Sequence, residues 1–464
     1  MGRLTVMKDK KTYSLTFEKS ESVLRILQRN GFSLRATCGG KGTCNHCLVV
    51  ADGVKQRACQ LPAEDGMTIT LLPDTLDIEV ELDTKANSFP PKASFDTTKS
   101  HYGVAIDIGT TTIALSLVDL SDGSILASHG FLNPNVSYGA DVLSRIEASN
   151  NGQLSEIRDS LISSLVQGIQ DLLDSAQVLP SHLESVCIAA NTTMCHLLLG
   201  LSCETLGKAP FSPVMLNYPV MSGRELLGSL DGNDFDEMKI TVLPGLSAFL
   251  GGDITAGLFS LPLANHNASF LFVDLGTNGE MVLSTGECCF ATSVAAGPAF
   301  EGSRVPGSIV LDAVYEMLKK RVLDTTGLLH GMFFHSGYRY QNHIFTQEDI
   351  RSIQLAKASV RAGIETLLHT ATISAEDISH IYLCGGFGTH TDTDIAVSIG
   401  MFPESFRGKI VPMGNTSLAG AVQYLIDRND EFFKDLQKKT KIVELASSQV
   451  YQEAYVRWMD FLIE

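Results

Sequence analysis

The chain begins with short segments in which apolar and polar residues alternate, which is the pattern of strands that bury one face. Residues 3–7 and 12–17 alternate in this way, a helix-like stretch follows at 20–31, and residues 47–51 and 67–72 are further strand candidates. This order of two strands, a helix, a loop and more strands predicts a small domain at the N-terminus, built from one sheet and one helix.

A polar stretch separates this region from the rest of the chain. Residues 84–101 contain two adjacent prolines and show no periodicity, so we predict a linker there, between a first domain at 1–83 and a second at 102–464. From residue 102 onward, short apolar strands alternate with long helical patterns, which predicts an α/β domain. We expect it to consist of two halves, at about 102–250 and 251–464.

The two halves share a recurring order of elements: three short strands, then helices, then another strand. The sequence Ile-Asp-Ile-Gly-Thr-Thr-Thr at 106–112 has a counterpart in Val-Asp-Leu-Gly-Thr-Asn-Gly at 273–279. Such a repeat predicts a duplicated domain with a cleft between its halves. The predicted strand triplets lie at 102–107, 112–120 and 124–132, and at 269–274, 279–284 and 287–292.

Charge and hydropathy exclude several classes of function. The 35 Lys and Arg residues against 52 Asp and Glu give a net charge of −17, which counts against a protein that binds nucleic acid through its phosphates. No apolar run approaches the length of a membrane span, so we expect no membrane insertion. The charged N-terminus does not fit a signal peptide, and we therefore expect a cytoplasmic protein.

Four of the ten cysteines gather in one short region, with the spacing C-x5-C-x2-C-x11-C. Four thiolates suit either a tetrahedral zinc or an iron–sulfur cluster, and inert thiols are the third alternative. Zinc sites usually contain two closely spaced cysteine pairs of the form C-x2-4-C, whereas one such pair is present here. Glycines crowd the loop and allow its backbone N–H groups to approach sulfur, which favours [2Fe–2S]. The predicted ligands are Cys38, Cys44, Cys47 and Cys59.

The two repeated hairpins carry residues suited to phosphate. Asp107 and Asp274 each end a strand, where a carboxylate can hold a hydrated Mg²⁺, although an ordinary turn carboxylate is the alternative for both. A third, glycine-rich turn follows a later strand and suits adenosine. No G-x4-G-K-[ST] loop is present, which argues against a P-loop ATPase. The predicted nucleotide-binding residues are Gly109, Thr110, Thr111, Thr112, Gly276, Thr277, Asn278, Gly385, Gly386, Phe387 and Gly388.

These motifs resemble known families. The N-terminal region resembles the plant-type and adrenodoxin-like [2Fe–2S] ferredoxins of β-grasp fold, with a shorter gap before the last cysteine. The three nucleotide motifs resemble the superfamily of acetate and sugar kinases, 70-kDa heat-shock chaperones and actin, which has a duplicated RNase H-like fold. With five further stretches, the chain resembles the ATP-dependent reductive activators of corrinoid proteins over nearly its whole length. Those stretches are 133–134, 138–146, 191–194, 251–254 and 295–302.

The resemblance implies an activity. A [2Fe–2S] cluster would donate one electron to the inactive Co(II) state of a corrinoid protein in a methyltransferase system, giving Co(I), and Mg-ATP binding and hydrolysis would be coupled to this transfer. The identity of the upstream electron donor stays open, and so does the question of whether the chain forms a homodimer. Relatives of this kind carry an extra middle domain, whereas only the short linker stands at that place here.

Three other functions are weighed against this one. A small-molecule kinase or ATPase with a redox-sensing ferredoxin domain is the main alternative. The others are an activator of radical dehydratases and a plain ferredoxin with a degenerate second domain. Two smaller questions also stay open. Asp253 either reaches the cleft or caps a helix, and the helix at 347–372 presents Lys357 and Arg361 on one face, which predicts a solvated surface.

Overall fold

The structure is a computed structural model of the 464-residue chain. It describes most of the chain; the largest gaps fall in the cysteine-rich loop, in the segments that follow the N-terminal domain and in three later loops. The described residues are 2–8, 11–18, 21–30, 32, 34, 36, 38, 40–42, 47–72, 80–82, 101–228, 235–262, 268–276, 278–297 and 307–462. Among these residues, no helix is both long enough and apolar enough to span a bilayer.

The N-terminal region forms a five-stranded sheet in the order β2-β1-β5-β3-β4, with helix α1 (Val23–Arg29) packed on it. Strands β1 and β5 are parallel, and the other neighbours are antiparallel. Strand β4 was not predicted from the sequence because its four residues are all exposed and show no alternation. The strands are β1 (Gly2–Lys8), β2 (Lys11–Phe17), β3 (Leu48–Ala51), β4 (Val54–Arg57) and β5 (Thr68–Leu71), and the 3-10 helix η1 spans Ala58–Gln60.

A six-stranded sheet in the order β10-β11-β9-β6-β7-β8 follows. Strands β6, β7 and β8 form an antiparallel meander, and β9 joins β6 in parallel. The strands are β6 (Tyr102–Ile108), β7 (Thr112–Asp119), β8 (Ile125–Leu132), β9 (Leu183–Ala190), β10 (Met221–Ser222) and β11 (Lys239–Val242). The helices are η2 (Pro134–Ser137), α2 (Val142–Ala148), η3 (Ser149–Gln153), α3 (Leu154–Ala176), η4 (Pro180–His182), α4 (Thr192–Leu199), η5 (Glu204–Leu206) and α5 (Gly223–Leu227).

A second six-stranded sheet repeats this plan in the order β18-β17-β12-β13-β14-β19. Its meander is β12–β13–β14, and β17 joins β12 in parallel, as β9 joins β6. The strands are β12 (Phe270–Leu275), β13 (Gly279–Ser284), β14 (Cys289–Val294), β17 (His380–Cys384), β18 (Ile410–Gly414) and β19 (Thr440–Ile442); β15 (Tyr338–Tyr340) and β16 (His343–Phe345) form a separate hairpin. The matching order of strands is that expected of a duplication.

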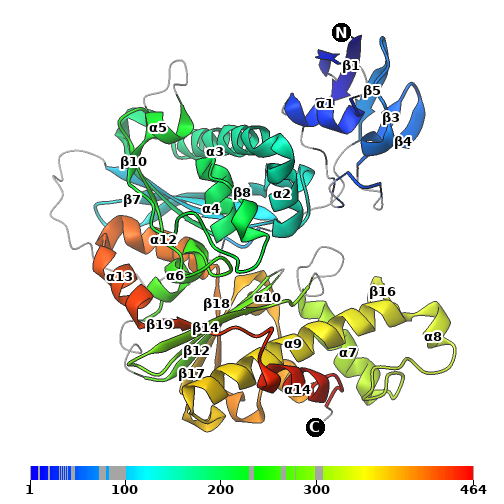
Figure 1. Cartoon of the computed structure of the whole chain (residues 1–464), viewed down its shortest axis with the longest axis vertical. Coiled ribbons are helices and arrows are strands. Elements are labelled where there is room, and N and C mark those ends of the chain that lie inside the picture. The colour runs from blue at the N-terminus through cyan, green and yellow to red at the C-terminus, as the bar shows by residue number, and fades with distance from the viewer. Residues whose placement is uncertain are drawn as a thin grey trace.

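The helices of this later part cover the second sheet and join it to the first. Helices α6 and α12 lie between the two large sheets (Figure 1), and α12 packs its apolar face against β6 and β9 of the first sheet. The helices are α6 (Gly252–Phe259), α7 (Gly307–Lys319), α8 (Phe333–Ser336), α9 (Gln347–Ala371), η8 (Ala375–Asp377), α10 (Gly385–His390), α11 (Thr393–Ser398), η9 (Glu404–Phe406), α12 (Thr416–Asp427), α13 (Asp430–Lys439) and α14 (Gln449–Arg457).

The predicted solvated face of the helix at 347–372 is wrong. Lys357 is fully buried and Arg361 nearly so, because α14 and the residues after it lie along α9 (Figure 1). The Lys357 ammonium donates to the carbonyl of Asp460 at 2.6 Å, and the Arg361 guanidinium stacks 3.8 Å from the ring centre of Trp458. Periodicity placed the two cations on one face, but it could not show that the C-terminal segment covers that face.

Candidate functional site

The cysteine-rich loop is attached to the hairpin of β3 and β4. Cys47 directly precedes β3, and the Ala58 N–H donates to the Cys47 carbonyl at 2.8 Å, which brings Cys59 alongside. On the other side, a Cβ placed on Gly40 would lie 3.8 Å from the Cβ of Cys59. The hairpin and the loop therefore bring this part of the loop against Cys59. Cys44 lies outside the described residues.

The donor set and the loop backbone fit the predicted cluster. Gly40 and Gly42 adopt φ values of +80° and +76°, a conformation that favours glycine and lets the chain turn tightly. Two side chains hold this turn: Gln60 Nε2 donates to the Gly40 carbonyl at 3.2 Å, and Arg57 Nη1 donates to the Gly42 carbonyl at 2.9 Å. A thiolate-rich loop with glycine turns is chemically suited to iron and sulfide.

Asp107 is the penultimate residue of β6 and is held by residues from the second half. Its Oδ2 accepts from Asn415 Nδ2 at 2.9 Å, and its Oδ1 accepts from Ser417 Oγ at 2.8 Å. Burial raises the pKa of the Asp107 carboxyl, and these two hydrogen bonds oppose that rise. The sequence did not predict Asn415 and Ser417, because they lie 308 and 310 positions after Asp107 and belong to no recognisable motif.

Three side chains brace the hairpin that follows Asp107. Asn133 Nδ2 donates to the Gly109 carbonyl at 2.7 Å, Arg145 Nη2 donates to the Thr110 carbonyl at 2.5 Å, and Asn191 Nδ2 donates to Thr110 Oγ1 at 3.2 Å. Arg145 is fully buried and also donates through Nε to the Gly139 carbonyl at 3.0 Å. These residues belong to stretches that the sequence singled out without giving them a role.

Asp274 is the penultimate residue of β12 in the second half, at the position that corresponds to Asp107. Burial and the charge of Asp107 raise the pKa of Asp274 to about 7. Glu280 lies opposite Asp274 in the register of β12 and β13, and burial and the charges of Asp253 and Asp274 raise its pKa. Glu280 was also missed, although it follows the second hairpin by a single residue. Of the other predicted residues here, Asn278 accepts from the Gly276 N–H at 2.9 Å, and Thr277 lies outside the described residues.

The surroundings of Asp253 support both alternatives. Helix α6 begins after Gly251, which has no side chain to cap it, and Asp253 Oδ1 accepts from the Ile254 N–H in the first turn at 2.8 Å. Burial, and then the charge of Asp274, raise the pKa of Asp253 to about 7, with a smaller contribution from Asp107. Asp253 therefore lies with the acids of both hairpins. Four half-buried carboxylates in mutual repulsion form a site that a cation would stabilise. Among the described residues, however, no three metal-ligating side chains are disposed around one ion.

The third predicted turn meets the second hairpin. Gly385 has φ of +80°, and a Cβ placed on it would lie 2.7 Å from Asp274 Oδ1 and 2.9 Å from the Leu275 carbonyl oxygen. Only glycine allows this close approach. Gly386 is exposed with open space around it, whereas Phe387 belongs to the buried core of the second half. Any part that Phe387 plays in binding a nucleotide therefore falls to its backbone.

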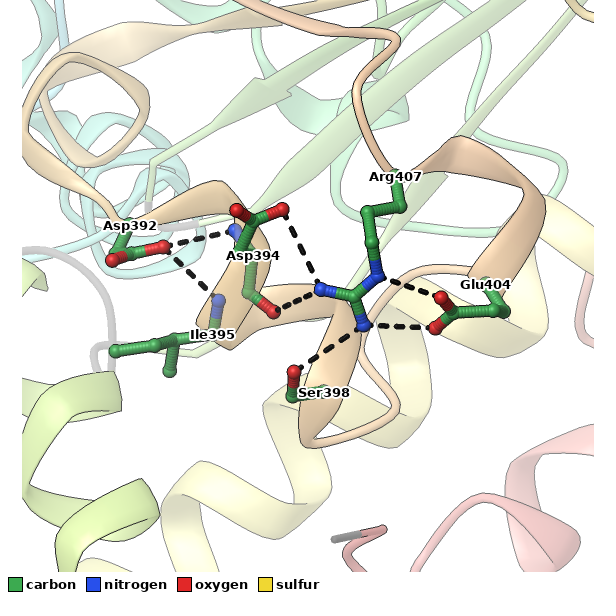
Figure 2. Close-up of polar contacts among 6 residues, drawn as sticks. All are labelled: Asp392, Asp394, Ile395, Ser398, Glu404 and Arg407. Atoms are coloured by element: carbon green, nitrogen blue, oxygen red, sulfur yellow. Dashed lines mark hydrogen bonds and ion pairs between the residues drawn. The ribbon is translucent and has the colours of Figure 1, made fainter. Parts of the chain in front are cut away.

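A surface network braces the segment after this turn. Figure 2 shows Arg407 between η9 and α11, where its guanidinium donates to Glu404 at 2.6 and 2.9 Å and to Ser398 Oγ at 3.3 Å. It also approaches the Asp394 carboxylate at 3.5 Å. The Asp392 side chain accepts from two N–H groups at the start of α11. This network joins α11 to η9 from outside.

Comparison with known proteins places each region. The model of a 2Fe-2S iron-sulfur cluster binding domain matches residues 4–72, the RACo middle region matches 102–266, and the C-terminal domain of RACo, described as the ASKHA domain, matches 268–307 and 304–463. The middle-region model thus falls on the first half of the predicted nucleotide domain, directly after the predicted linker.

Two curated relatives and one solved structure are similar over most of their lengths. The corrinoid activation enzyme RamQ of Eubacterium limosum is 24% identical, covering 92% of this chain and 94% of its own. A [Co(II) methylated amine-specific corrinoid protein] reductase of Methanosarcina barkeri is 23% identical over 76% of each chain. The structure of a reductive activator for corrinoid,iron-sulfur protein is 22% identical, with a TM-score of 0.70, over 99% of this chain and 98% of that one.

These matches confirm the predicted fold class, a [2Fe–2S] ferredoxin-like domain followed by a duplicated domain of the actin and sugar-kinase type. They support an iron–sulfur cluster and a nucleotide as cofactors. The individual site residues and the domain boundaries stay predictions.

Proposed function

Because the chain belongs to the RACo family, whose two region models together match most of it, we propose that it is an ATP-dependent reductive activator of a corrinoid protein. One electron reduces inactive Co(II) to Co(I), and ATP is bound and hydrolysed where the two halves meet. The observation that carries the proposal is the presence in one chain of a thiolate-rich ferredoxin loop and a paired set of acidic hairpins. The activities named for the two curated relatives support it.

The ferredoxin loop supplies the electron-transfer site. Cys38, Cys44, Cys47 and Cys59 would hold the [2Fe–2S] cluster, which when bound supplies one-electron chemistry. The chain's own contribution is to fix the loop: Gln60 and Arg57 hold the carbonyls of its glycine turns. Gln60 Nε2 also lies 3.8 Å from Cys59 Sγ, and a hydrogen bond to thiolate sulfur helps to set a cluster's reduction potential.

The acidic hairpins supply the nucleotide site. Backbone N–H groups and hydroxyls of Gly109, Thr110 and Thr111 would bind phosphate oxygens from one side, and the turn at 276–278 from the other. Asp107 and Asp274 would hold Mg²⁺ through water, with Asp253 and Glu280 adding negative charge nearby. The raised pKa values of these acids support a cation site, because a cation removes the repulsion that raises them.

The nucleotide makes an unfavourable electron transfer productive. The reduction potential of plant-type ferredoxins lies near −400 mV, and that of the Co(II)/Co(I) couple is lower. Each 59 mV or so against a one-electron transfer lowers its equilibrium constant about tenfold. A change of conformation on ATP binding or hydrolysis can offset this cost by altering how the corrinoid protein is held.

Three finer statements belong to the same proposal. The corrinoid partner would serve a methyltransferase system, the protein would act in the cytoplasm, and two copies of the chain would associate as a homodimer. The net charge of −17 favours a partner with a basic or neutral docking face.

The decisive assay follows the Co(II) absorption band of a corrinoid protein, with a chemical reductant, in the presence and absence of Mg-ATP. We expect Co(I) to be trapped only with Mg-ATP. Equal Co(I) trapping without nucleotide would overturn the proposal and favour a kinase or a plain ferredoxin.

The cluster is tested separately on anaerobically purified protein. It should hold about two iron and two sulfide per chain, and Cys47→Ser should bleach its visible absorption while ATP binding persists. Stoichiometric zinc instead would end the redox interpretation.

A further inference from the structure

The ferredoxin-like domain is docked on the first half of the nucleotide domain. The short helix η2 receives three polar contacts: Gln28 Nε2 donates to the Ser137 carbonyl, the Leu34 N–H donates to Ser137 Oγ at 3.1 Å, and the Ala36 N–H approaches the Val136 carbonyl at 3.5 Å. Figure 1 shows the N-terminal sheet at one corner of the molecule, beside α2. The ferredoxin-like domain therefore has a defined docking surface on η2 and α2, which we call its seat.

The seat lies beside the cluster loop and is polar. The Lys41 ammonium, three residues after Cys38, pairs with Glu147 Oε2 of α2 at 2.8 Å. A cavity of about 320 Å³ remains between the domains, and Gly40 and Cys59 line it on the cluster side. Polar contacts are typical of interfaces between domains that move relative to one another, whereas permanent interfaces are more apolar.

The elements that form the seat also hold the first phosphate hairpin. Asn133, which caps η2, donates to the Gly109 carbonyl, and Arg145, two residues before Glu147 in α2, donates to the Thr110 carbonyl. A displacement of the hairpin by bound phosphate would therefore move η2 and α2. The amide of Asn135 in η2 is buried without a hydrogen-bond partner among the described residues, a cost that another position of η2 would remove.

The segment that tethers the ferredoxin-like domain is attached to the same site at a second point. Val80 and Leu82 pack against the apolar cluster that α12 shares with the first sheet. A Cβ on Gly130 of β8 would lie 2.6 Å from Val80, so the two residues are in close contact. Asn415 Nδ2 donates both to the Glu81 carbonyl at 3.2 Å and to Asp107 Oδ2 at 2.9 Å. One amide thus joins the tether to the acid of the first hairpin.

This attachment sets how far the ferredoxin-like domain can travel. With Val80 held, the chain from Leu72 spans at most about 28 Å, at 3.3–3.6 Å per residue. Without the contacts of residues 80–82, the limit is set by the chain length from Leu72 to His101, which spans at most about 100 Å. Release would therefore change the reach of the cluster several-fold.

We propose that nucleotide binding between the two halves releases the ferredoxin-like domain from its seat on η2 and α2 and frees its tether at residues 80–82. This inference rests on the proposed nucleotide site. Both carboxylate oxygens of Asp107 are bonded to the second half here. A hydrated cation at Asp107 would compete with Asn415 and Ser417 for the carboxylate oxygens, and a shift of Asn415 would disturb its hydrogen bond to Glu81. The nucleotide-free chain thus keeps the cluster loop beside α2, and the nucleotide-bound chain presents it to a partner.

A zero-length carbodiimide cross-link between Lys41 and Glu147 measures the seat directly, because it joins an amine and a carboxylate already in contact. Mass spectrometry of the full-length, cluster-loaded protein should find this cross-link without nucleotide. A nonhydrolysable ATP analogue with Mg²⁺ should lower its yield by roughly threefold or more. The pair Lys320–Glu316, also at 2.8 Å, is the internal reference and should not change.

Two variants that leave the nucleotide site untouched test the tether. Gly130→Ala should displace Val80, and Val80→Asp should remove its apolar contact; each should lower the Lys41–Glu147 yield without nucleotide, because a longer tether lowers the effective concentration of the domain at its seat. Val54→Asp, at an exposed position of β4, is the control and should leave the yield unchanged. Thermal unfolding checks that each variant is folded.

The outcomes separate the two proposals. If calorimetry shows that the analogue binds but the cross-link yield does not fall, release by nucleotide is wrong and the proposed function stands. A Lys41–Glu147 yield at background without nucleotide would also overturn the inference. If no analogue binds, the nucleotide site itself is wrong.

Discussion

The two hairpins of the duplicated domain share a sequence signature but differ in how the protein supports them. Around the first, Asn133, Arg145 and Asn191 bond to the turn, and Asn415 and Ser417 bond to Asp107. At the second, the turn is closed by a hydrogen bond from Gly276 to Asn278. Among the described residues, no side chain donates a hydrogen bond to Asp274, which lies instead near Asp253 and Glu280.

The difference indicates that the two hairpins contribute differently to ligand binding. The first hairpin is held by side chains of the protein before any ligand binds, so a ligand that shifts this hairpin also shifts the elements that hold it. The second hairpin concentrates negative charge that the protein leaves uncompensated, so its acids gain most when a cation arrives. Duplication therefore supplied two similar turns, and the surrounding residues gave them different roles.

The largest effect is expected on ATP turnover when either acid is removed. Asp107→Ala and Asp274→Ala should each lower the rate by about 10²–10³-fold, as the loss of one preorganised electrostatic group does. The comparison predicts a further difference: the Mg²⁺ concentration for half-maximal rate should rise more in Asp274→Ala. Steady-state rates against Mg²⁺ measure both. Normal hydrolysis in both variants would make the hairpins plain structural turns.

The next largest effect tests the brace of the first hairpin. Arg145→Met keeps the bulk of the side chain but removes the donor to the buried Gly139 carbonyl and to the half-buried Thr110 carbonyl, which should cost about 2–4 kcal/mol of unfolding free energy. Nucleotide affinity should fall as well. Denaturant titration and calorimetry measure the two quantities.

Arg158→Met is the matched control for this brace. Arg158 also donates to two carbonyls of the first half, those of Leu198 and Leu226, away from the hairpin. The Arg158→Met variant should lower the free energy of unfolding without changing the affinity for nucleotide. Equal affinity losses in both variants would show that the brace acts only through general stability.

The uncompensated charge at the second hairpin should appear as a pH dependence of stability. The pKa of Asp274 is about 7 in the folded chain and about 3.9 unfolded. Between these values the folded state binds more protons, so the metal-free protein should lose stability as the pH rises from 4 to 7. Asp274→Asn should then be more stable than the parent at pH 8, by about 1–3 kcal/mol, and the gap should narrow at pH 5.

Denaturant titration in a chelator, repeated at both pH values, measures this gap. Added Mg²⁺ should stabilise the parent more than the variant, because the cation compensates the charge that the variant lacks. A variant that is less stable than the parent at pH 8 would mean that Asp274 is already compensated, and the contrast between the hairpins would disappear.

The sequence predicted what lies in one continuous stretch. Each acidic hairpin is a run of a few residues in which Asp, Gly and hydroxyl side chains are neighbours, and the cysteine spacing is equally local. The sequence did not predict three site residues, because their role depends on which strands pair and on how α12 packs against the first sheet. They are Asn415, Ser417 and Glu280. Lys357 was misjudged for the same reason: helical periodicity defines a face, but tertiary packing decides what covers it.

The smallest effect concerns Arg407, whose guanidinium contacts Glu404, Ser398 and Asp394 (Figure 2). Arg145 is fully buried, whereas the side chain of Arg407 is 36% exposed. Water replaces lost contacts at an exposed site, and exposed ion pairs contribute little. Arg407→Ala should therefore leave the unfolding midpoint and ATP turnover unchanged within error, measured beside Arg145→Met. A loss of turnover in Arg407→Ala would show that the brace of α11 reaches the glycine turn at 385–388, and the second half would then be organised by the protein as the first is.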